Sequence, residues 1–184
     1  MDLHLLAAAY DRSAAGYDER FRPLQRTKFR VAAPLLRPLP AGARCLDAGG
    51  GTGLFSEWLA AGPDEEPSAL LRASLAQARW LVLDASLGML QVARGRGAVC
   101  VAADLALPPS RPRSFELVIA FTSVLERVSA SLASLSTLVA AQGTLCLSFL
   151  AEEALSAAKL EGATGLRMRA QADAGQDRIF VLER

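Results

Sequence analysis

The sequence predicts an α/β fold: a Rossmann-like, doubly wound and mostly parallel sheet inside a three-layer sandwich. Three observations support this prediction. Short apolar runs recur along the chain with the length and composition of buried parallel strands. Stretches with helical spacing alternate with several of these runs. A glycine-rich loop follows the first run, where parallel α/β sheets bind their ligands. The predicted strands are 43–47, 80–84, 98–102, 115–121 and 143–150.

The residues before the first strand are predicted to be mainly helical. Leu24, Val31 and Leu35 have the spacing of one helix face, and this helix should end before Pro38. Residues 10–19 are predicted to form a short helix and a loop. The N-terminal part of the chain can therefore cover the sheet as a helical lid.

The connection between the first two strands is longer than a compact unit requires. Asp84, at the end of the second strand, lies well beyond the spacing of about 20 residues expected after Asp47. Leu71 and Leu75 have helical spacing within residues 62–79, which predicts an additional surface helix. It could be a subunit contact or an ornament of the fold, and we favour the ornament.

The last third of the chain changes pattern. Apolar residues recur every three to four positions from Leu125 to Val139, which predicts an amphipathic helix. Residues 166–171 instead alternate between apolar and polar, residues 173–175 form a turn, and residues 178–183 run back as a strand. This predicts an antiparallel hairpin added to the edge of the parallel sheet.

Composition restricts the class of protein. The 184 residues carry a net charge of +1, so no overall positive field would hold a nucleic-acid backbone. No apolar run has the about 18–20 residues of a membrane helix, and no signal-peptide pattern is present. Cys45, Cys100 and Cys146 lie in predicted strands without metal-site spacing, which indicates free, buried thiols and no metal centre. We therefore expect a cytoplasmic protein that binds neither nucleic acid nor membrane.

Basic residues gather before the glycine loop. They can be the solvated face of a helix, which is the common role of surface charge. They can also be a basic lip that receives an acidic substrate or carrier. The residues are Arg20, Arg22, Arg26, Lys28, Arg30 and Arg37.

The glycine loop differs from the loops that bind phosphate groups. Its spacing is Gly49-x-Gly51-x-Gly53, whereas the dinucleotide fingerprint is G-x-G-x-x-G. Asp47 precedes it, and a carboxylate there would repel a pyrophosphate and attract an ammonium group. A P-loop would also require a lysine. The ligand is therefore expected to carry positive charge near this loop.

Acidic residues also end the next two strands. Asp84 can accept hydrogen bonds from both hydroxyls of a ribose. Asp104 can accept from an exocyclic adenine amine, while the backbone N–H of Leu105 faces the ring. Taken alone, Asp104 can equally be a turn or capping residue. Three strands in succession that end in Asp are not explained by packing, so the pattern favours an adenosine ligand with a cationic end.

These segments resemble the ordered motifs of class I S-adenosylmethionine-dependent methyltransferases, with closest likeness to the subgroup of ubiquinone/menaquinone and malonyl-carrier-protein methyltransferases. The opening residues 10–19 also resemble that subgroup, and the likeness covers nearly the whole chain. The segments that carry it are 46–53, 83–90 and 104–108, followed by 114–118.

The resemblance implies S-adenosylmethionine as cofactor, S-adenosylhomocysteine as product and one methyltransferase domain over 1–184. Within it, 1–40 would be the helical lid and 41–184 the cofactor-binding core. Phe121 would lie near the methyl group, and Tyr17 would close over the cofactor. The remaining contacts implied by the resemblance are the methionine part at Asp47, Gly49, Gly51 and Gly53, the ribose at Asp84, and the adenine at Ala85, Met89, Asp104 and Leu105.

The catalytic residues are not evident. Methyl transfer needs a general base only if the nucleophile must lose a proton. Relatives often carry a histidine after the fourth strand, but His4, near the N-terminus, is the one histidine here. Glu126 and Tyr17 are weak alternatives. We hypothesise that the nucleophile is a carboxylate or an already activated carbon, which needs no strong protein base.

Three functions remain open from the sequence. The first is O- or C-methylation of a small molecule or a carrier-bound acid, with a pocket that is open or completed by a second subunit in a homodimer. The second is a non-catalytic S-adenosylmethionine-binding subunit or regulatory remnant of the same fold. The third is a dinucleotide-dependent oxidoreductase, which the glycine spacing and Asp47 disfavour. Enzymes that methylate amino groups of DNA and of some proteins carry an Asn/Asp-Pro-Pro-aromatic tetrad after the fourth strand. Phe121–Val124 stand at this place here, which argues against such a substrate.

Overall fold

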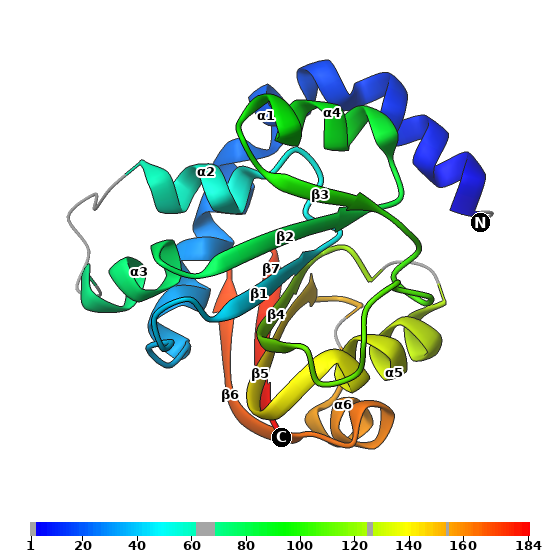
Figure 1. The fold of residues 1–184 in the computed structure, drawn as a ribbon. Coiled ribbons are helices and arrows are strands. Elements are labelled where there is room, and N and C mark those ends of the chain that lie inside the picture. Colours follow the sequence, from blue (N-terminus) through cyan, green and yellow to red (C-terminus); the bar gives the residue numbers. More distant parts are fainter. Residues whose placement is uncertain (1–2, 62–68, 125–126, 154) are drawn as a thin grey trace.

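The computed structural model describes residues 3–61, 69–124, 127–153 and 155–184. These residues form a seven-stranded sheet with the order β3-β2-β1-β4-β5-β7-β6, which runs through the middle of the molecule (Figure 1). Its strands are β1 (Arg44–Ala48), β2 (Arg79–Asp84), β3 (Val99–Ala102), β4 (Phe115–Phe121), β5 (Val139–Leu150), β6 (Arg167–Ala174) and β7 (Asp177–Glu183).

The strand directions confirm the predicted doubly wound sheet. Strands β1 to β5 are mutually parallel where they pair, whereas β7 pairs antiparallel with both β5 and β6. The chain order reverses between β1 and β4, which are neighbours in the sheet but not in the sequence. Ligands of such sheets bind at this switch point, beyond the carboxyl ends of the strands.

Helices cover both faces of the sheet, which gives the predicted three layers (Figure 1). One face carries α1, α2, α3 and α4, and the other carries α5 and α6. A short 3₁₀ turn, Ala33–Leu35, follows α1. The helices are α1 (Leu3–Ala32), α2 (Leu54–Ala60), α3 (Ala69–Ala76), α4 (Leu87–Gly95), α5 (Val128–Leu138) and α6 (Ala157–Thr164).

The N-terminal helix is longer than predicted. The sequence predicts a short helix and a loop over residues 10–19 and a second helix from residue 24. This prediction is wrong, because α1 is continuous through Gly16 and Pro23. Proline removes one helical hydrogen bond, and glycine weakens a helix interior. Contacts of α1 with α2, α4, β6 and β7 stabilise the helix against these local costs.

The additional helix between β1 and β2 is present as α3, and it belongs to the core. Leu71 and Leu75 are buried in the same apolar cluster as Phe29 and Phe55. The indole Nε1 of Trp80 donates to the backbone oxygen of Leu75 at 2.8 Å. Helix α3 is therefore part of the apolar core and not an ornament of the fold. The first part of the predicted 62–79 insertion, up to residue 68, lies outside the described residues.

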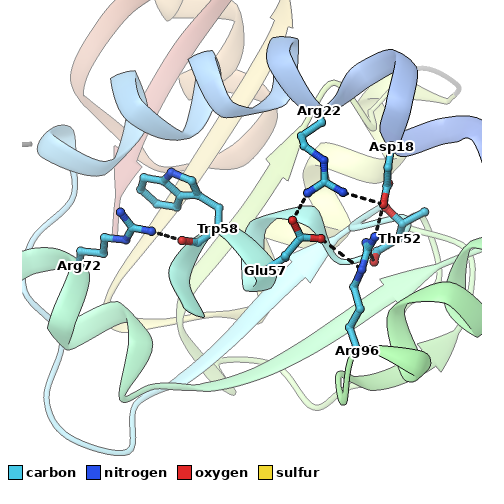
Figure 2. Close-up of polar contacts among 7 residues, drawn as sticks. All are labelled: Asp18, Arg22, Thr52, Glu57, Trp58, Arg72 and Arg96. Atoms are coloured by element: carbon cyan, nitrogen blue, oxygen red, sulfur yellow. Dashed lines mark hydrogen bonds and ion pairs between the residues drawn. The ribbon is translucent and has the colours of Figure 1, made fainter. Parts of the chain in front are cut away.

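Arg72 of α3 packs on α2. Its guanidinium carbon lies 4.3 Å from the centre of the Trp58 ring, and its Nη2 donates to the backbone oxygen of the same residue (Figure 2). Arg72 is only 6 % exposed, so this cation is buried against an aromatic face. The contact fixes α3 on α2.

The remaining boundaries differ by a few residues. Strand β5 already begins at Val139, and the hairpin turn consists of Gly175 and Gln176 instead of residues 173–175. Gly175 adopts φ 67°, which the tight turn requires. All three cysteines are free, and Cys100 on β3 is only partly buried, in contrast to the expectation. Among the described residues, no helix is both long and apolar enough to cross a membrane.

Candidate functional site

A pocket opens at the carboxyl ends of the parallel strands, beneath α1. Its empty volume is about 1140 Å³ when space open to solvent is included. Most of the residues predicted from the sequence line this pocket, although they come from four strand ends and two helices. They are Tyr17, Asp47, Gly49, Gly51, Asp84, Ala85, Met89, Asp104, Leu105 and Phe121.

Three predicted residues are placed differently. Gly53 does not line the pocket. It precedes α2 with φ 77°, and a Cβ at this position would lie 3.4 Å from the Cβ of Ala93, so this glycine serves the turn and the packing of α2 on α4. His4 lies on α1 but does not line the pocket. Glu126 lies outside the described residues.

The glycine loop is shaped by a close approach to Asp47. The backbone N–H groups of Gly49 and Gly50 both donate to the backbone oxygen of Leu83, at 2.6 and 3.2 Å. A Cβ on Gly50 would lie 2.5 Å from the carboxyl carbon of Asp47. The G-x-G-x-G spacing did not single out Gly50, and the run of three adjacent glycines was the signal that could have found it.

Asp47 is a buried carboxylate that has no cation beside it among the described residues. It is 4 % exposed, and its Oδ2 has no hydrogen-bond partner among the described residues. Burial, with the nearby charge of Asp84, raises the pKa of Asp47 to about 7. A cationic group in the pocket would stabilise the ionised form of this side chain.

Asp84 is held by the backbone. Its Oδ2 accepts from the N–H of Gly51 at 2.9 Å, and its Oδ1 accepts from the N–H of Ser86 at 2.8 Å. Burial raises the pKa of this carboxyl, and the two backbone hydrogen bonds oppose that rise. Each oxygen keeps a lone pair, so the carboxylate can still accept from two hydroxyls of a ligand.

Asp104 also forms a turn, which is the alternative role that the sequence left open for it. Its Oδ1 accepts from the backbone N–H of Ala106 at 2.8 Å, two residues on. Its Oδ2 pairs with Nη1 of Arg127 at 2.7 Å. The side chain lines the pocket as well, so the turn does not prevent contact with a ligand.

Helix α1 forms one wall of the pocket. The hydroxyl of Tyr17 accepts from Nε2 of Gln25 at 3.4 Å, and burial raises the pKa of Tyr17 to about 12. The phenol is therefore protonated near neutral pH and does not suit the role of a general base. Tyr10 lines the same wall, with its ring centre 6.3 Å from that of Tyr17.

Asp11 attaches the beginning of α1 to α4. Its Oδ1 accepts from the hydroxyl of Ser86 at 2.6 Å and from the N–H of Gly88 at 2.8 Å. The same serine hydroxyl accepts from the N–H of Met89 and thereby caps α4. The pKa of Asp11 is lowered, first by the hydrogen bond from Ser86 and then by that from Gly88. Sequence reasoning missed Asp11, because its partners lie far along the chain.

A cluster of charged residues attaches the middle of α1 to the glycine loop and α2 (Figure 2). The hydroxyl of Thr52 donates to Oδ1 of Asp18 at 2.6 Å, and Nη1 of Arg96 donates to the backbone oxygen of Thr52 at 2.6 Å. Arg96 also pairs with Asp18, and its Nε lies 3.2 Å from Oε2 of Glu57. Arg22 bridges Asp18 and Glu57. Arg22, a member of the predicted basic lip, is thus held in ion pairs within the fold.

A second polar cluster, buried except for Thr122, joins α1 to the ends of β4 and β7. Nζ of Lys28 lies 3.3 Å from Oδ2 of Asp177 and donates to Oγ1 of Thr122 at 2.5 Å. The Thr122 hydroxyl donates to Oδ1 of Asp177 at 2.6 Å and contacts the Ser148 hydroxyl at 3.0 Å. Burial lowers the pKa of Lys28, and the charge of Asp177 opposes that change.

This cluster holds an unusual backbone conformation beside the pocket. Thr122 lines the pocket and adopts φ 48°, which is unfavourable for a β-branched residue. Its hydroxyl has one proton and two lone pairs, and all three are engaged by Asp177, Lys28 and Ser148. The cluster is therefore closed: it positions the end of β4 and leaves no hydroxyl site for a proton from a substrate.

Comparison with known proteins identifies the fold. No protein-family model matches the chain, and a search of curated proteins finds no significant match. Among solved structures, a methyltransferase of Haloferax volcanii, determined in complex with the Trm112 methyltransferase activator, is similar with a TM-score of 0.71 and 16% identity. The match covers 95% of this chain and 96% of that one.

Two further structures show what the fold can carry. Magnesium protoporphyrin IX methyltransferase of Synechocystis PCC 6803, with bound S-adenosylhomocysteine, matches with a TM-score of 0.69 and 18% identity over 96% of this chain and 98% of that one. The [4+2]-cyclase SpnF matches with a TM-score of 0.65 and 13% identity over 86% and 80%. The chain therefore has the class I methyltransferase fold, and the function must be argued from its own site.

Proposed function

We propose that this protein is an S-adenosylmethionine-dependent methyltransferase that acts on a small molecule or a carrier-bound acid. The observation that carries the proposal is the unpaired, buried carboxylate of Asp47 beside the glycine loop. A buried charge without a partner is unfavourable, and a ligand that brings an ammonium group would relieve that cost. A pyrophosphate would increase it, which argues against a dinucleotide.

The pocket offers a contact for each part of the cofactor. Asp47 and the backbone of Gly49 and Gly51 suit the methionine part, and the free lone pairs of Asp84 suit the ribose hydroxyls. Ala85, Met89, Asp104 and Leu105 lie where the adenine would follow. Tyr17 suits a closing side chain from α1.

Bound S-adenosylmethionine would supply an electrophilic methyl group on a sulfonium. The protein's own residues would hold the acceptor in line with that methyl and exclude water. Phe121 and Ser123 line this part of the pocket, and the Ser123 hydroxyl donates to the backbone oxygen of Ala48 at 2.7 Å. The raised pKa of Tyr17 and the closed hydrogen bonding of Thr122 favour an acceptor that needs no strong protein base.

A second candidate is a protein of this fold that binds S-adenosylmethionine without transferring its methyl group. The similarity to a [4+2]-cyclase supports this second candidate, since that protein carries out another kind of chemistry on the same fold. We further propose that the protein is cytoplasmic, that it can form a homodimer and that it acts on neither nucleic acid nor membrane.

The first experiment compares cofactors by calorimetry. We expect S-adenosylhomocysteine to bind and NADH not to bind. Tight NADH binding without S-adenosylhomocysteine binding would refute the proposal. A single-turnover assay with methyl-labelled S-adenosylmethionine and a panel of small carboxylic acids then separates the two candidates, because only a methyltransferase moves the label to an acceptor.

A further inference from the structure

The part of the pocket that the cofactor does not need has its own chemistry. This inference rests on the proposed function, because it assigns the glycine loop and the ends of β2 and β3 to the cofactor. The remaining wall is formed by α1 and by the ends of β4 and α5. Its ring-bearing residues are Tyr10, Tyr17, Phe29 and Phe121.

The charged residues that line the whole pocket are mostly acidic. Among the described lining residues, Asp47, Asp84 and Asp104 are acidic, and Arg127 is the one cation. Arg127 pairs with Asp104 through Nη1 at 2.7 Å, and its side chain is 54% exposed. A guanidinium has a fork of five N–H donors, so this contact leaves donors for a second carboxylate.

The backbone of Arg127 is also unusual. It adopts φ 50° immediately before α5, a conformation that is unfavourable for a residue other than glycine, asparagine or aspartate. Residues held in such conformations gather at ligand sites. The pairing with Asp104 orients the side chain from the opposite lip of the pocket.

The neighbouring cation cannot take this role. Lys28 is 4% exposed and does not line the pocket. Its Nζ is held by Asp177 and by Thr122 within the closed cluster. An acidic ligand that enters the pocket therefore meets Arg127.

We propose that the methyl acceptor is an aromatic carboxylic acid, and that Arg127 is the residue that selects it by binding the carboxylate. The aromatic body packs against the partly exposed rings of Tyr10 and Tyr17 on α1, next to the buried rings of Phe29 and Phe121. The carboxylate takes the guanidinium donors that Asp104 leaves free. The acid group thus gives orientation, and the rings give most of the apolar contact.

The test uses 2-naphthoate and its neutral analogue 2-naphthamide as probes of the protein saturated with S-adenosylhomocysteine. Calorimetry should show that naphthoate binds at least about tenfold more tightly than naphthamide, since hydrogen bonds to charged groups are the stronger ones. Arg127→Met should abolish this preference, mainly through weaker naphthoate binding. Arg127→Lys should retain part of it.

The matched control is Arg111→Met, an exposed arginine that does not line this pocket. It should keep the full preference for naphthoate. Equal binding of the two probes by the wild type, no measurable naphthoate binding, or an unchanged preference in Arg127→Met would each overturn the inference.

The same titrations separate this inference from the proposed function. S-adenosylhomocysteine affinity is measured first for every variant, which also shows that the variant is folded. If the wild type does not bind S-adenosylhomocysteine, the proposed function fails. If it does bind and the naphthoate preference is absent, only the acceptor assignment fails.

Discussion

Asp47 and Asp177 are both buried carboxylates near the pocket, but their surroundings differ in one respect. Asp177, at the start of β7, is 1% exposed and has Lys28 at 3.3 Å and the Thr122 hydroxyl at 2.6 Å. Asp47, at the end of β1, is 4% exposed, and its Oδ2 has neither a hydrogen bond nor a cation among the described residues, whereas Oδ2 of Asp177, which also lacks a hydrogen bond, has the Lys28 ammonium. The charge of Asp84 acts on Asp47 and has the same sign.

The difference separates a structural carboxylate from one kept for a ligand. Burial penalises both charges, and a buried ion pair offsets that penalty only when its partners are well placed. The protein supplies the partner of Asp177 itself, from α1. The partner of Asp47 must come from a bound molecule, so the two sites should respond differently to mutation, ligand and pH.

The largest effect is expected at the paired site. Lys28→Met removes the cation and leaves Asp177 buried without compensation, which should lower the free energy of unfolding by about 3–5 kcal/mol. Denaturant unfolding measures this value. Lys159→Met, an exposed lysine on α6, is the control and should change stability little.

The double variant Lys28→Met/Asp177→Asn tests the cause. It removes both charges, so it should recover a large part of the lost stability. If the single and the double variant were equally unstable, the ion pair would not be the reason for the effect.

The unpaired site should show the opposite pattern. Asp47→Asn should weaken S-adenosylhomocysteine binding by about 10–100-fold, because a charge-assisted hydrogen bond to its ammonium group is lost. The unliganded protein should lose no more than about 1 kcal/mol of stability, since no buried ion pair is broken. Calorimetry and unfolding in the absence of ligand give the two values. Asp173→Asn, an exposed acid of the hairpin, should alter neither.

The comparison also predicts a pH dependence. With its pKa raised to about 7, Asp47 keeps its proton in the folded state while the unfolded state has already lost it. Its contribution therefore lowers stability as pH rises from about 4 to about 7, because the folded state binds more protons in that window. A cationic ligand prefers the ionised form, so S-adenosylhomocysteine affinity should rise by about tenfold between pH 6 and pH 8.

Calorimetry at several pH values measures this change. Asp47→Asn should remove the dependence, and Asp173→Asn should retain it. An affinity that is flat with pH in the wild type would contradict the assignment of the cationic group to Asp47.

The smallest effect is expected in the partly exposed cluster of Figure 2. The Glu57 side chain is 30% exposed and pairs with Arg22 and Arg96. Glu57→Gln should cost only about 0.2–1 kcal/mol, since solvent weakens such pairs. Unfolding at low and high salt measures it, and the difference from the wild type should shrink at high salt. A loss of stability as large as that of Lys28→Met would mean that burial does not determine how much an ion pair contributes to the free energy of unfolding.

Much of the fold follows from local patterns. The runs at 80–84 and 115–121 lie within one residue of β2 and β4, because strands in the middle of a parallel sheet are mainly apolar. Asp47 and Asp84 could be predicted as site residues for a similar reason. The carboxyl ends of parallel strands meet at one edge, so acids at those ends must gather there.

The elements that depend on distant contacts could not be predicted in the same way. The loop predicted within residues 10–19 is absent, and α1 continues through Gly16 and Pro23, since packing against other elements outweighs a local preference. Asp104 satisfied two local interpretations at once, and only its contacts show that it forms a turn while lining the pocket.

The sequence by itself determined the architecture, the place of the binding pocket and the acidic residues around it, because periodicity and strand order are local and topological properties. Only the tertiary structure decided which charges are already paired. Lys28, Thr122 and Asp177 lie in three distant parts of the chain, and no local pattern joins them. The state of Asp47 was decided in the same way, since a missing partner can be recognised only when every neighbouring element is in place.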